Sequence, residues 1–360
     1  MSRCFNFSSG PAVLPEEVLL EAQANLLDYK GAGLSIMECS HRGKEFEPVI
    51  AEAQANILKL MGLGDDYYVL FLTGGASFQF AQIPMNFLGA GQTADYINTG
   101  TWANKAVKEA KLVGNVNVAA DTSKSKPAAM PHQADLKLTN GAAYVHLCTN
   151  ETIEGSQFKT IPQVSAPLIG DMSSDIFSRP LDFSKFAMIY AGAQKNIGPA
   201  GVTLVVIRKD FAARGSDKLP VILRYKTHID EGAMYNTPPC FPIYLVMLVT
   251  RWIEKRGGLA ALSKVNADKA AKLYAAMDGS GGYYRGTAAK EFRSDMNVTF
   301  RLPSEELEEK FVKEASAKGM KQLKGHRSVG GIRASIYNAF PPAGVDALIA
   351  FMLEFAAKNG

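Results

Sequence analysis

Residues 186–208 read FAMIYAGAQKNIGPAGVTLVVIR, and this stretch decides the fold. Two apolar, strand-like runs flank a loop of glycine, alanine and asparagine, so we expect one strand to end at Gly192 and the next to begin at Val202. Lys195 lies on that loop. A lysine held on such a partly dry platform has a lowered pKa, and its free amine becomes a nucleophile. The alternative, an ordinary turn lysine, describes most lysines taken one at a time.

An aspartate follows another short apolar run upstream of Lys195. Residues 166–170 read APLIG, and Asp171 comes next. Acids at the ends of strands often serve a ligand in α/β proteins. Asp171 and Lys195 together meet the needs of pyridoxal phosphate, which takes a lysine on its aldehyde and a carboxylate on its ring nitrogen. Such a pair also arises by chance, so it is a weak signal when taken alone.

A glycine turn, TGGAS at 73–77, joins the apolar run 68–72 to an apolar-periodic segment at 78–88. Gly74 and Gly75 let the backbone approach an anion, and the unpaired N–H groups of the helix start point at it. The pattern therefore predicts a phosphate cradle. It is neither a P-loop nor a dinucleotide fingerprint, because Gly-Lys-Ser/Thr and G-x-G-x-x-G are both missing. A purely structural turn fits this segment equally well.

Two further loops follow strand-like runs. Residues 93–98 (TADYIN) lead to Trp102, and residues 142–148 (AAYVHLC) lead to Thr152. Loops that follow the carboxyl ends of parallel strands converge on one crevice, so we expect all of these loops to share a mouth. Trp102 is one of two tryptophans, and its ring is suited to stacking on an aromatic cofactor. A tryptophan that packs on the core at a helix start is the alternative.

Nine motifs, in order, carry a resemblance that covers almost the whole chain. They are FNFSSGPAVLP (5–15), ECSHRGKEF (38–46), FLTGGASFQF (71–80), NTGTWANKA (98–106), NETIEG (150–155), DMSSDIFSRP (171–180), YAGAQKNIGPAG (190–201), MYNTPP (234–239) and GHRSVGGIRASIYNA (325–339). Together they resemble the phosphoserine aminotransferases, homodimeric pyridoxal-phosphate enzymes of the class V aminotransferase family and of fold type I. The resemblance implies an α/β, aspartate-aminotransferase-like large domain with a mainly parallel sheet, plus a smaller α+β C-terminal domain.

The resemblance also implies roles for residues at matching positions. The catalytic group would be Lys195 on the cofactor aldehyde, Asp171 on the ring nitrogen and Trp102 on the ring face, while Thr152 would contact the phenolic oxygen. The cofactor phosphate would be bound by Ala76, Ser77 and Gln194, with Asn236 and Thr237 of the other subunit. The substrate's anionic groups would be bound by Ser9, His41, Arg42, His326, Arg327 and Arg333. Some relatives carry an arginine where Ser77 stands, so the distal anion has one candidate partner fewer here.

The implied reaction interconverts O-phospho-L-serine plus 2-oxoglutarate with 3-phosphohydroxypyruvate plus L-glutamate, in serine biosynthesis. Both amino acids carry an α-carboxylate and a distal anion, so the pocket needs two separated cationic clamps. The pairs at 41–42 and 326–327, with Arg333, supply them. Arginine suits this task because its fork forms two hydrogen bonds to a carboxylate or phosphate and keeps its charge. A solvated cluster of cations is the alternative reading of these pairs.

The composition of the chain favours an intracellular enzyme that acts on small molecules. The chain has 360 residues, 47% of them hydrophobic, which is enough for two domains with sizeable cores. No apolar run approaches the ~18 residues of a membrane span, and the N-terminus lacks a signal-peptide stretch, so we expect a cytoplasmic protein without a membrane partner. The four cysteines are scattered, which argues for buried thiols and against a metal site or disulfides. A net charge of +4 without an aromatic-interleaved basic run argues against nucleic acid.

The order of helix and strand signals divides the chain in two. Helices are expected at 16–29 and 45–60, and strand and helix signals alternate from about 67 to 256. We therefore expect a large cofactor-binding domain over 16–257 and a small domain over 258–360. The N-terminal tail 1–15 is expected to join the small domain. In the small domain we expect helices to about 277, at 305–318 and at 344–358, and strands at 296–302 and 332–336.

Two rival functions use the same fold. A cysteine desulfurase needs a nucleophilic cysteine on a mobile loop after the lysine, whereas only Cys240 follows Lys195, inside the segment expected to bind phosphate. A catalytically silent binding protein would have no use for the lysine, the aspartate and the arginines of the clamps. Both rivals therefore explain fewer residues than a transaminase does.

Overall fold

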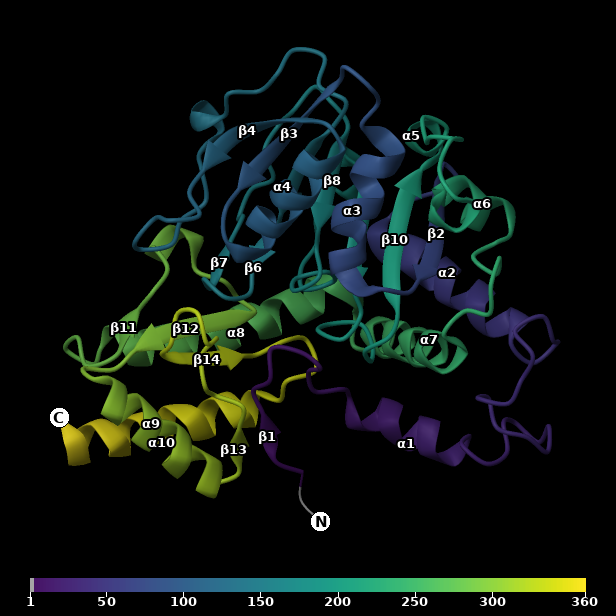
Figure 1. The fold of residues 1–360 in the computed structure, drawn as a ribbon. Coiled ribbons are helices and arrows are strands. Elements are labelled where there is room, and N and C mark those ends of the chain that lie inside the picture. The colour runs from purple at the N-terminus through teal and green to yellow at the C-terminus, as the bar shows by residue number, and fades with distance from the viewer. Residues whose placement is uncertain (1–2) are drawn as a thin grey trace.

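The computed structural model describes residues 3–360, and a seven-stranded sheet forms its centre (Figure 1). The strand order is β2-β10-β9-β8-β5-β3-β4. β10 runs antiparallel to β2 and β9, and the other neighbouring pairs are parallel, which confirms the mainly parallel sheet. The strands are β2 (Tyr67–Leu72), β3 (Thr93–Asn98), β4 (Asn115–Asp121), β5 (Val145–Cys148), β8 (Leu168–Asp171), β9 (Phe186–Gly192) and β10 (Thr203–Arg208).

Helices pack against this sheet and against one another. α3 and α4 pack together over the face turned to the viewer in Figure 1, and α2 packs against α7 and β2. The helices of this part are α1 (Glu16–Ala24), α2 (Glu47–Met61), α3 (Gly75–Phe87), α4 (Thr101–Val113), α5 (Lys209–Ala212), α6 (Tyr225–Asp230) and α7 (Cys240–Lys255). A short hairpin of β6 (Asn150–Glu151) and β7 (Ser156–Gln157) follows β5.

A second, smaller hydrophobic cluster lies in the C-terminal part. Its buried residues run from Ala270 to Phe355 and include Phe7 of the N-terminal tail, because β1 pairs in parallel with β13. The larger cluster extends to Leu262, so the division near residue 257 stays a prediction. The elements are β1 (Phe5–Asn6), α8 (Gly258–Asp278), β11 (Arg285–Gly286), β12 (Asn297–Arg301), α9 (Glu305–Ala317), β13 (Met320–Lys321), β14 (Ile332–Ser335) and α10 (Pro342–Asn359).

Some boundaries and one burial differ from expectation. α1 ends at Ala24, not near residue 29, where the amide of Asn25 donates back to the carbonyl of Glu21 at 2.9 Å. The apolar run 244–249 lies in α7, where all six side chains are buried. The four cysteines are free thiols, but only Cys39 and Cys148 are buried, so the expectation of burial is wrong for the exposed Cys4.

Over residues 3–360, no helix combines the length and the apolar character that crossing a bilayer requires. The same residues contain no group of three or more histidine, cysteine, aspartate or glutamate side chains arranged to hold a metal ion.

Candidate active site

Lys195 lies in the loop after β9, at the edge of the sheet where the parallel strands end. Its Nζ donates to Thr152 Oγ1 at 2.7 Å and lies 5.3 Å from the centre of the Trp102 ring. Burial lowers the pKa of Lys195, and the nearby Asp171 opposes that shift. The structure therefore brings together three of the predicted residues around an amine that gives up its proton more readily than an exposed lysine.

Asp171 is the last residue of β8, paired in register with Cys148 of β5 and Tyr190 of β9. Ser173 donates to its Oδ1 twice, from the backbone N–H at 2.9 Å and from Oγ at 2.6 Å. Burial raises the pKa of Asp171, while these hydrogen bonds and Lys195 act in the opposite direction. Because both contacts from Ser173 reach one oxygen, the carboxylate is oriented and its Oδ2 is left for a ring N–H.

Trp102 is held by two glutamates that the sequence reading did not single out. Glu151 accepts from the backbone N–H groups of Trp102 at 3.1 Å and Ala103 at 3.0 Å, at the N-terminus of α4. Glu154 accepts from the N–H and the hydroxyl of Thr101 at 2.9 and 2.6 Å. The two carboxylates flank Thr152 in the chain, so one turn fixes both Thr152 and the helix that carries Trp102. The sequence feature that could have pointed to both glutamates is the Glu-x-x-Glu spacing inside NETIEG.

The N-terminus of α3 forms the predicted anion cradle. Gly74 and Gly75 have φ values of +93° and +69°, and no side chain caps the helix. A Cβ at Gly75 would meet nothing within 4 Å, so open space lies beside the free N–H groups of Ala76 and Ser77. Gln194 lies on the lysine loop, where its backbone carbonyl accepts from the N–H of Ala12 at 2.8 Å.

Substrate-binding candidates of the small domain lie on the other side of Lys195. Arg333 donates from Nη2 to Ser9 Oγ at 2.7 Å, and Tyr337 donates its hydroxyl to the carbonyl of Ser9 at 2.9 Å. A Cβ on the next residue, Gly10, would lie 3.4 Å from Cγ of Lys195, so Ser9 and Arg333 adjoin the amine. Tyr337 is another contact that the sequence reading missed.

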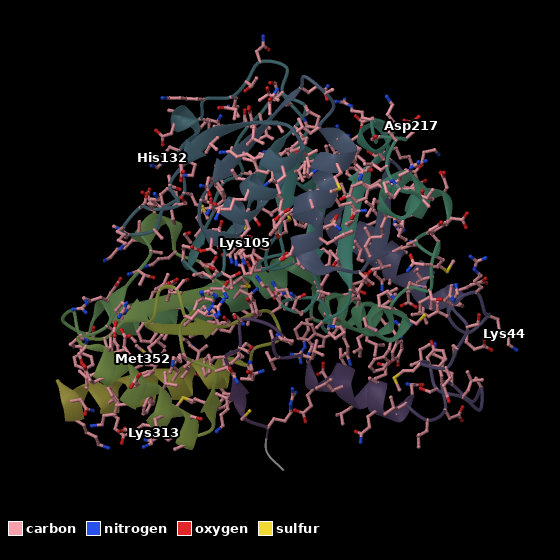
Figure 2. All side chains as sticks on the ribbon, in the orientation of Figure 1. Lys44, Lys105, His132, Asp217, Lys313 and Met352 are labelled. Carbon is pink, nitrogen blue, oxygen red and sulfur yellow. The ribbon has the colours of Figure 1, made fainter. Side chains whose placement is uncertain are left out.

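His326 and Arg333 line a cavity of about 720 Å³ between the two domains. Burial lowers the pKa of His326, and the positive charges of Arg333, Arg327 and Lys105 lower it further. Figure 2 shows nitrogen-bearing side chains gathered below Lys105, between the lower end of the sheet and the small domain. The region is therefore strongly positive, as the binding of a doubly anionic substrate requires.

Four predicted residues form a separate group, in which His41 is half-buried and the other three are exposed. Arg42 makes a long contact from Nη2 to the carbonyl of Met234 at 3.5 Å, and its Nε lies 3.4 Å from Nε2 of His41. Asn236 and Thr237 follow in the neighbouring loop, and both are exposed. Within residues 3–360, no hydrogen bond or ion pair joins these four residues to Lys195.

The residues near Lys195 fit pyridoxal phosphate. Lys195 offers an amine for an aldehyde, Asp171 an oriented carboxylate for a ring nitrogen, and Trp102 a flat ring face. The uncapped N-terminus of α3 suits a phosphate. The indole Nε1–H of Trp102 is buried and has no hydrogen-bond partner among the described residues.

Comparison with known proteins agrees with this chemistry. The family model described as aminotransferase class-V matches residues 4–348. A phosphoserine aminotransferase of Herpetosiphon aurantiacus is 54% identical over 357 residues, which is 99% of each chain. The solved phosphoserine aminotransferase of Bacillus circulans subsp. alkalophilus is 55% identical over 99% of each chain, with a TM-score of 0.98.

A pyridoxal-phosphate-bound phosphoserine aminotransferase of Trichomonas vaginalis is 41% identical, with a TM-score of 0.93, over 98% of this chain and all of that one. These matches span the whole length of the relatives and include both domains. The chain belongs to the class-V aminotransferase family and, within it, to the phosphoserine aminotransferases.

Proposed function

We propose that the chain is a pyridoxal-phosphate-dependent transaminase that interconverts O-phospho-L-serine plus 2-oxoglutarate with 3-phosphohydroxypyruvate plus L-glutamate. The observation that carries the proposal is the contact of Lys195 Nζ with Thr152 and the Trp102 ring, beside a cationic cavity. The relatives named above carry this activity in their names. A cysteine desulfurase is not favoured, because Cys240 lies at the start of α7 with its thiol turned to the carbonyl of Pro238.

The residues of this chain divide the work on the α-carbon. Lys195 would hold the cofactor covalently at rest and, once displaced by the incoming amine, would accept the Cα proton on Nζ. Its lowered pKa favours that role, because a base must be free of its proton before it can act. Asp171 would keep the ring nitrogen protonated, and the bound cofactor supplies an electron-withdrawing ring that makes the Cα proton acidic.

The positive side chains would orient the substrate at both ends. Arg333, next to Ser9 and Lys195, is placed to bind the α-carboxylate. The distal phosphate or carboxylate would then reach His326 and Arg327, together with His41 and Arg42 of the partner subunit. Two clamps at a fixed separation select substrates that carry two anions.

A homodimer with shared active sites and a cytoplasmic location belong to the same proposal. Support for the dimer comes from exposed apolar side chains, some of them in the chain segments that carry the separate group of site residues. Leu27 is 88% exposed, Met37 56% and Val221 45%, and Tyr235 adjoins Asn236 in the chain. Large exposed apolar side chains in one region are typical of a protein interface. Asn236 and Thr237 would complete the phosphate site of the partner.

The proposal is tested by comparing phosphoserine with serine as amino donor to 2-oxoglutarate. Serine lacks the distal anion, so we expect phosphoserine to be preferred at least ~100-fold in kcat/KM, since charge-assisted contacts at one clamp are worth on the order of 3 kcal/mol. Equal kcat/KM values would refute phosphoserine as the substrate and leave transamination standing. Release of sulfide from cysteine would favour the desulfurase instead.

A further inference from the structure

The loop that carries His326 and Arg327 is closed on itself between β13 and β14. The N–H of Gly325 donates to the carbonyl of Gly331 at 2.8 Å, and the N–H of Gly330 donates to the carbonyl of His326 at 2.9 Å. Inside the loop, Ser328 Oγ lies 2.7 Å from His326 Nδ1. These contacts fix the internal shape of the loop, so any motion would displace the loop as one piece.

Cavities lie on both sides of this loop. One, of about 880 Å³, separates the loop from α9 and is lined by Glu309, Lys313 and Arg327. The other is the cavity of about 720 Å³ that faces the large domain. Because dense packing is lacking on either side, the position of the loop depends on the contacts at its stem.

An ion pair in the small domain makes those stem contacts. Arg301, at the end of β12, donates from Nε to Oε1 of the buried Glu308 of α9 at 2.5 Å, and from Nη1 to the carbonyl of Val329 at 3.0 Å. The other oxygen of Glu308 accepts from the N–H of Gly331 at 3.1 Å. Each member of the pair therefore binds its partner and the loop backbone at once.

The loop passes so close to Arg301 that a side chain would not fit there. A Cβ on Gly331 would lie 2.7 Å from Cδ of Arg301 and 2.7 Å from the carbonyl oxygen of Phe300. Its φ of +72° also lies in the left-handed region that favours glycine. The stem is thus pressed onto Arg301, and the ion pair has little freedom to shift without moving the loop.

Electrostatics oppose this placement when no anion is bound. Arg327, Arg333 and Lys105 all lie close enough to His326 to lower its pKa, and like charges at close range repel. Turning the loop towards the acidic α9 would therefore lower the electrostatic free energy of Arg327. A fixed stem keeps His326 and Arg327 at the mouth of the site before the substrate arrives, which lowers the cost of binding.

We propose that Glu308 and Arg301 are positioning residues that hold the His326–Arg327 loop in place and so set the affinity for a distal anion. The inference rests on the proposed function, which gives His326 and Arg327 their substrate. It adds a pair that touches neither cofactor nor substrate and acts only through the backbone of Val329 and Gly331.

The test is the variant Glu308→Gln, assayed as holoenzyme with phosphoserine and with serine as amino donors. The amide cannot accept from both Arg301 and Gly331 as the carboxylate does, so we expect KM for phosphoserine to rise about tenfold with kcat within about twofold. The slow reaction with serine should stay unchanged, because serine has no distal anion. Glu305→Gln is the matched control, since Glu305 also faces Arg301, at 3.5 Å, but is largely exposed.

A wild-type KM for phosphoserine in Glu308→Gln would overturn the inference. So would an equal loss with both donors, because that pattern marks a general structural role. Should this variant fail to fold, Arg301→Lys replaces it, because an ammonium cannot serve Glu308 and Val329 in two directions at once; the same split between donors is expected. If the unmodified enzyme shows no preference for phosphoserine, the proposed function itself fails, and the two failures are thereby distinguished.

Discussion

The chemistry of Lys195 depends on which groups surround its amine. Nζ has one hydrogen-bond partner, Thr152, and no carboxylate within ion-pair distance among the described residues. Unlike a carboxylate, the hydroxyl of Thr152 does not stabilise the protonated form of the Lys195 amine. It also does not prevent the amine from attacking an aldehyde. Burial then lowers the pKa, and the Trp102 ring shields the amine from water on one side.

Replacing Lys195 by alanine should separate cofactor binding from catalysis. The fold and the phosphate cradle remain, so we expect Lys195→Ala to bind pyridoxal phosphate without a covalent bond and to lose nearly all turnover. Borohydride reduction followed by peptide mass spectrometry checks this directly. In the unmodified protein the reduced cofactor should map to Lys195, and cofactor mapped to another lysine would refute the assignment.

The sequence predicted the residues at strand ends better than the residues that support them. Lys195, Thr152 and Trp102 meet because loops after parallel strands share one edge, and the strands themselves are readable from apolar runs. Ser173 and Tyr337 were missed. Their contacts depend on the exact placement of distant backbone groups, which hydrophobic periodicity does not encode.

At the scale of elements, the N-terminus of α4 is unusual in taking a fully buried carboxylate. Burial and the neighbouring Glu154 raise the pKa of Glu151 to about 8, while N–H groups of α4 and the hydroxyl of Thr99 act against the rise. The hydrogen bonds from the N–H groups of Trp102 and Ala103 explain why a glutamate is tolerated there. Burying Glu151 costs desolvation free energy, which is offset by its role in anchoring the helix that carries Trp102.

This arrangement predicts a pH dependence of stability. The folded protein keeps the proton of Glu151 up to about pH 8, whereas the ordinary glutamate value is 4.5, so the folded state binds more protons in between. Stability should therefore fall as pH rises through that window. We expect the drop in Tm between about pH 5 and pH 8 to be smaller by at least ~3 °C in Glu151→Gln than in the unmodified protein.

The measurement is a series of thermal melts of the cofactor-free protein. Glu231→Gln, at an exposed position, should keep the slope of the unmodified protein. Identical slopes for Glu151→Gln and Glu231→Gln would contradict a raised pKa at Glu151.

Local sequence signals predicted where the helices and strands lie. They did not always predict the residues at which these elements begin and end. The expected strand 93–98 matches β3 residue for residue, and five of its six residues are buried. α1 is shorter than its apolar pattern, since Asn25 ends the helix with a side-chain contact that competes with the next turn. Pro84 inside α3 did not end that helix.

At the scale of the whole molecule, the proposed dimer gives the residues at 41–42 and 236–237 a role in the site of the partner subunit. In an isologous dimer both sites use the same two patches, so each subunit gives its lysine to one site and its arginine to the other. Two inactive variants, Lys195→Ala and Arg42→Glu, should then complement each other. Random exchange makes about half the dimers mixed, and roughly a quarter of all sites regain both residues.

Activity recovered on mixing, at about a quarter of the unmodified level, is the expected result of this complementation. Exchange of subunits is verified independently by mass spectrometry of differently tagged chains. If exchange occurs and no activity returns, Lys195 and Arg42 serve one site from the same chain, and the shared site is wrong.

The central claim is that this chain moves an amino group from phosphoserine to 2-oxoglutarate through Lys195, and isotope transfer tests it most directly. Phosphoserine labelled with nitrogen-15 is incubated with 2-oxoglutarate and the protein, and the products are read by mass spectrometry. We predict that the label appears in glutamate, with 3-phosphohydroxypyruvate formed in equal amount, and that Lys195→Ala yields essentially none. Label released as ammonia, or unlabelled glutamate from the unmodified protein, would contradict the account.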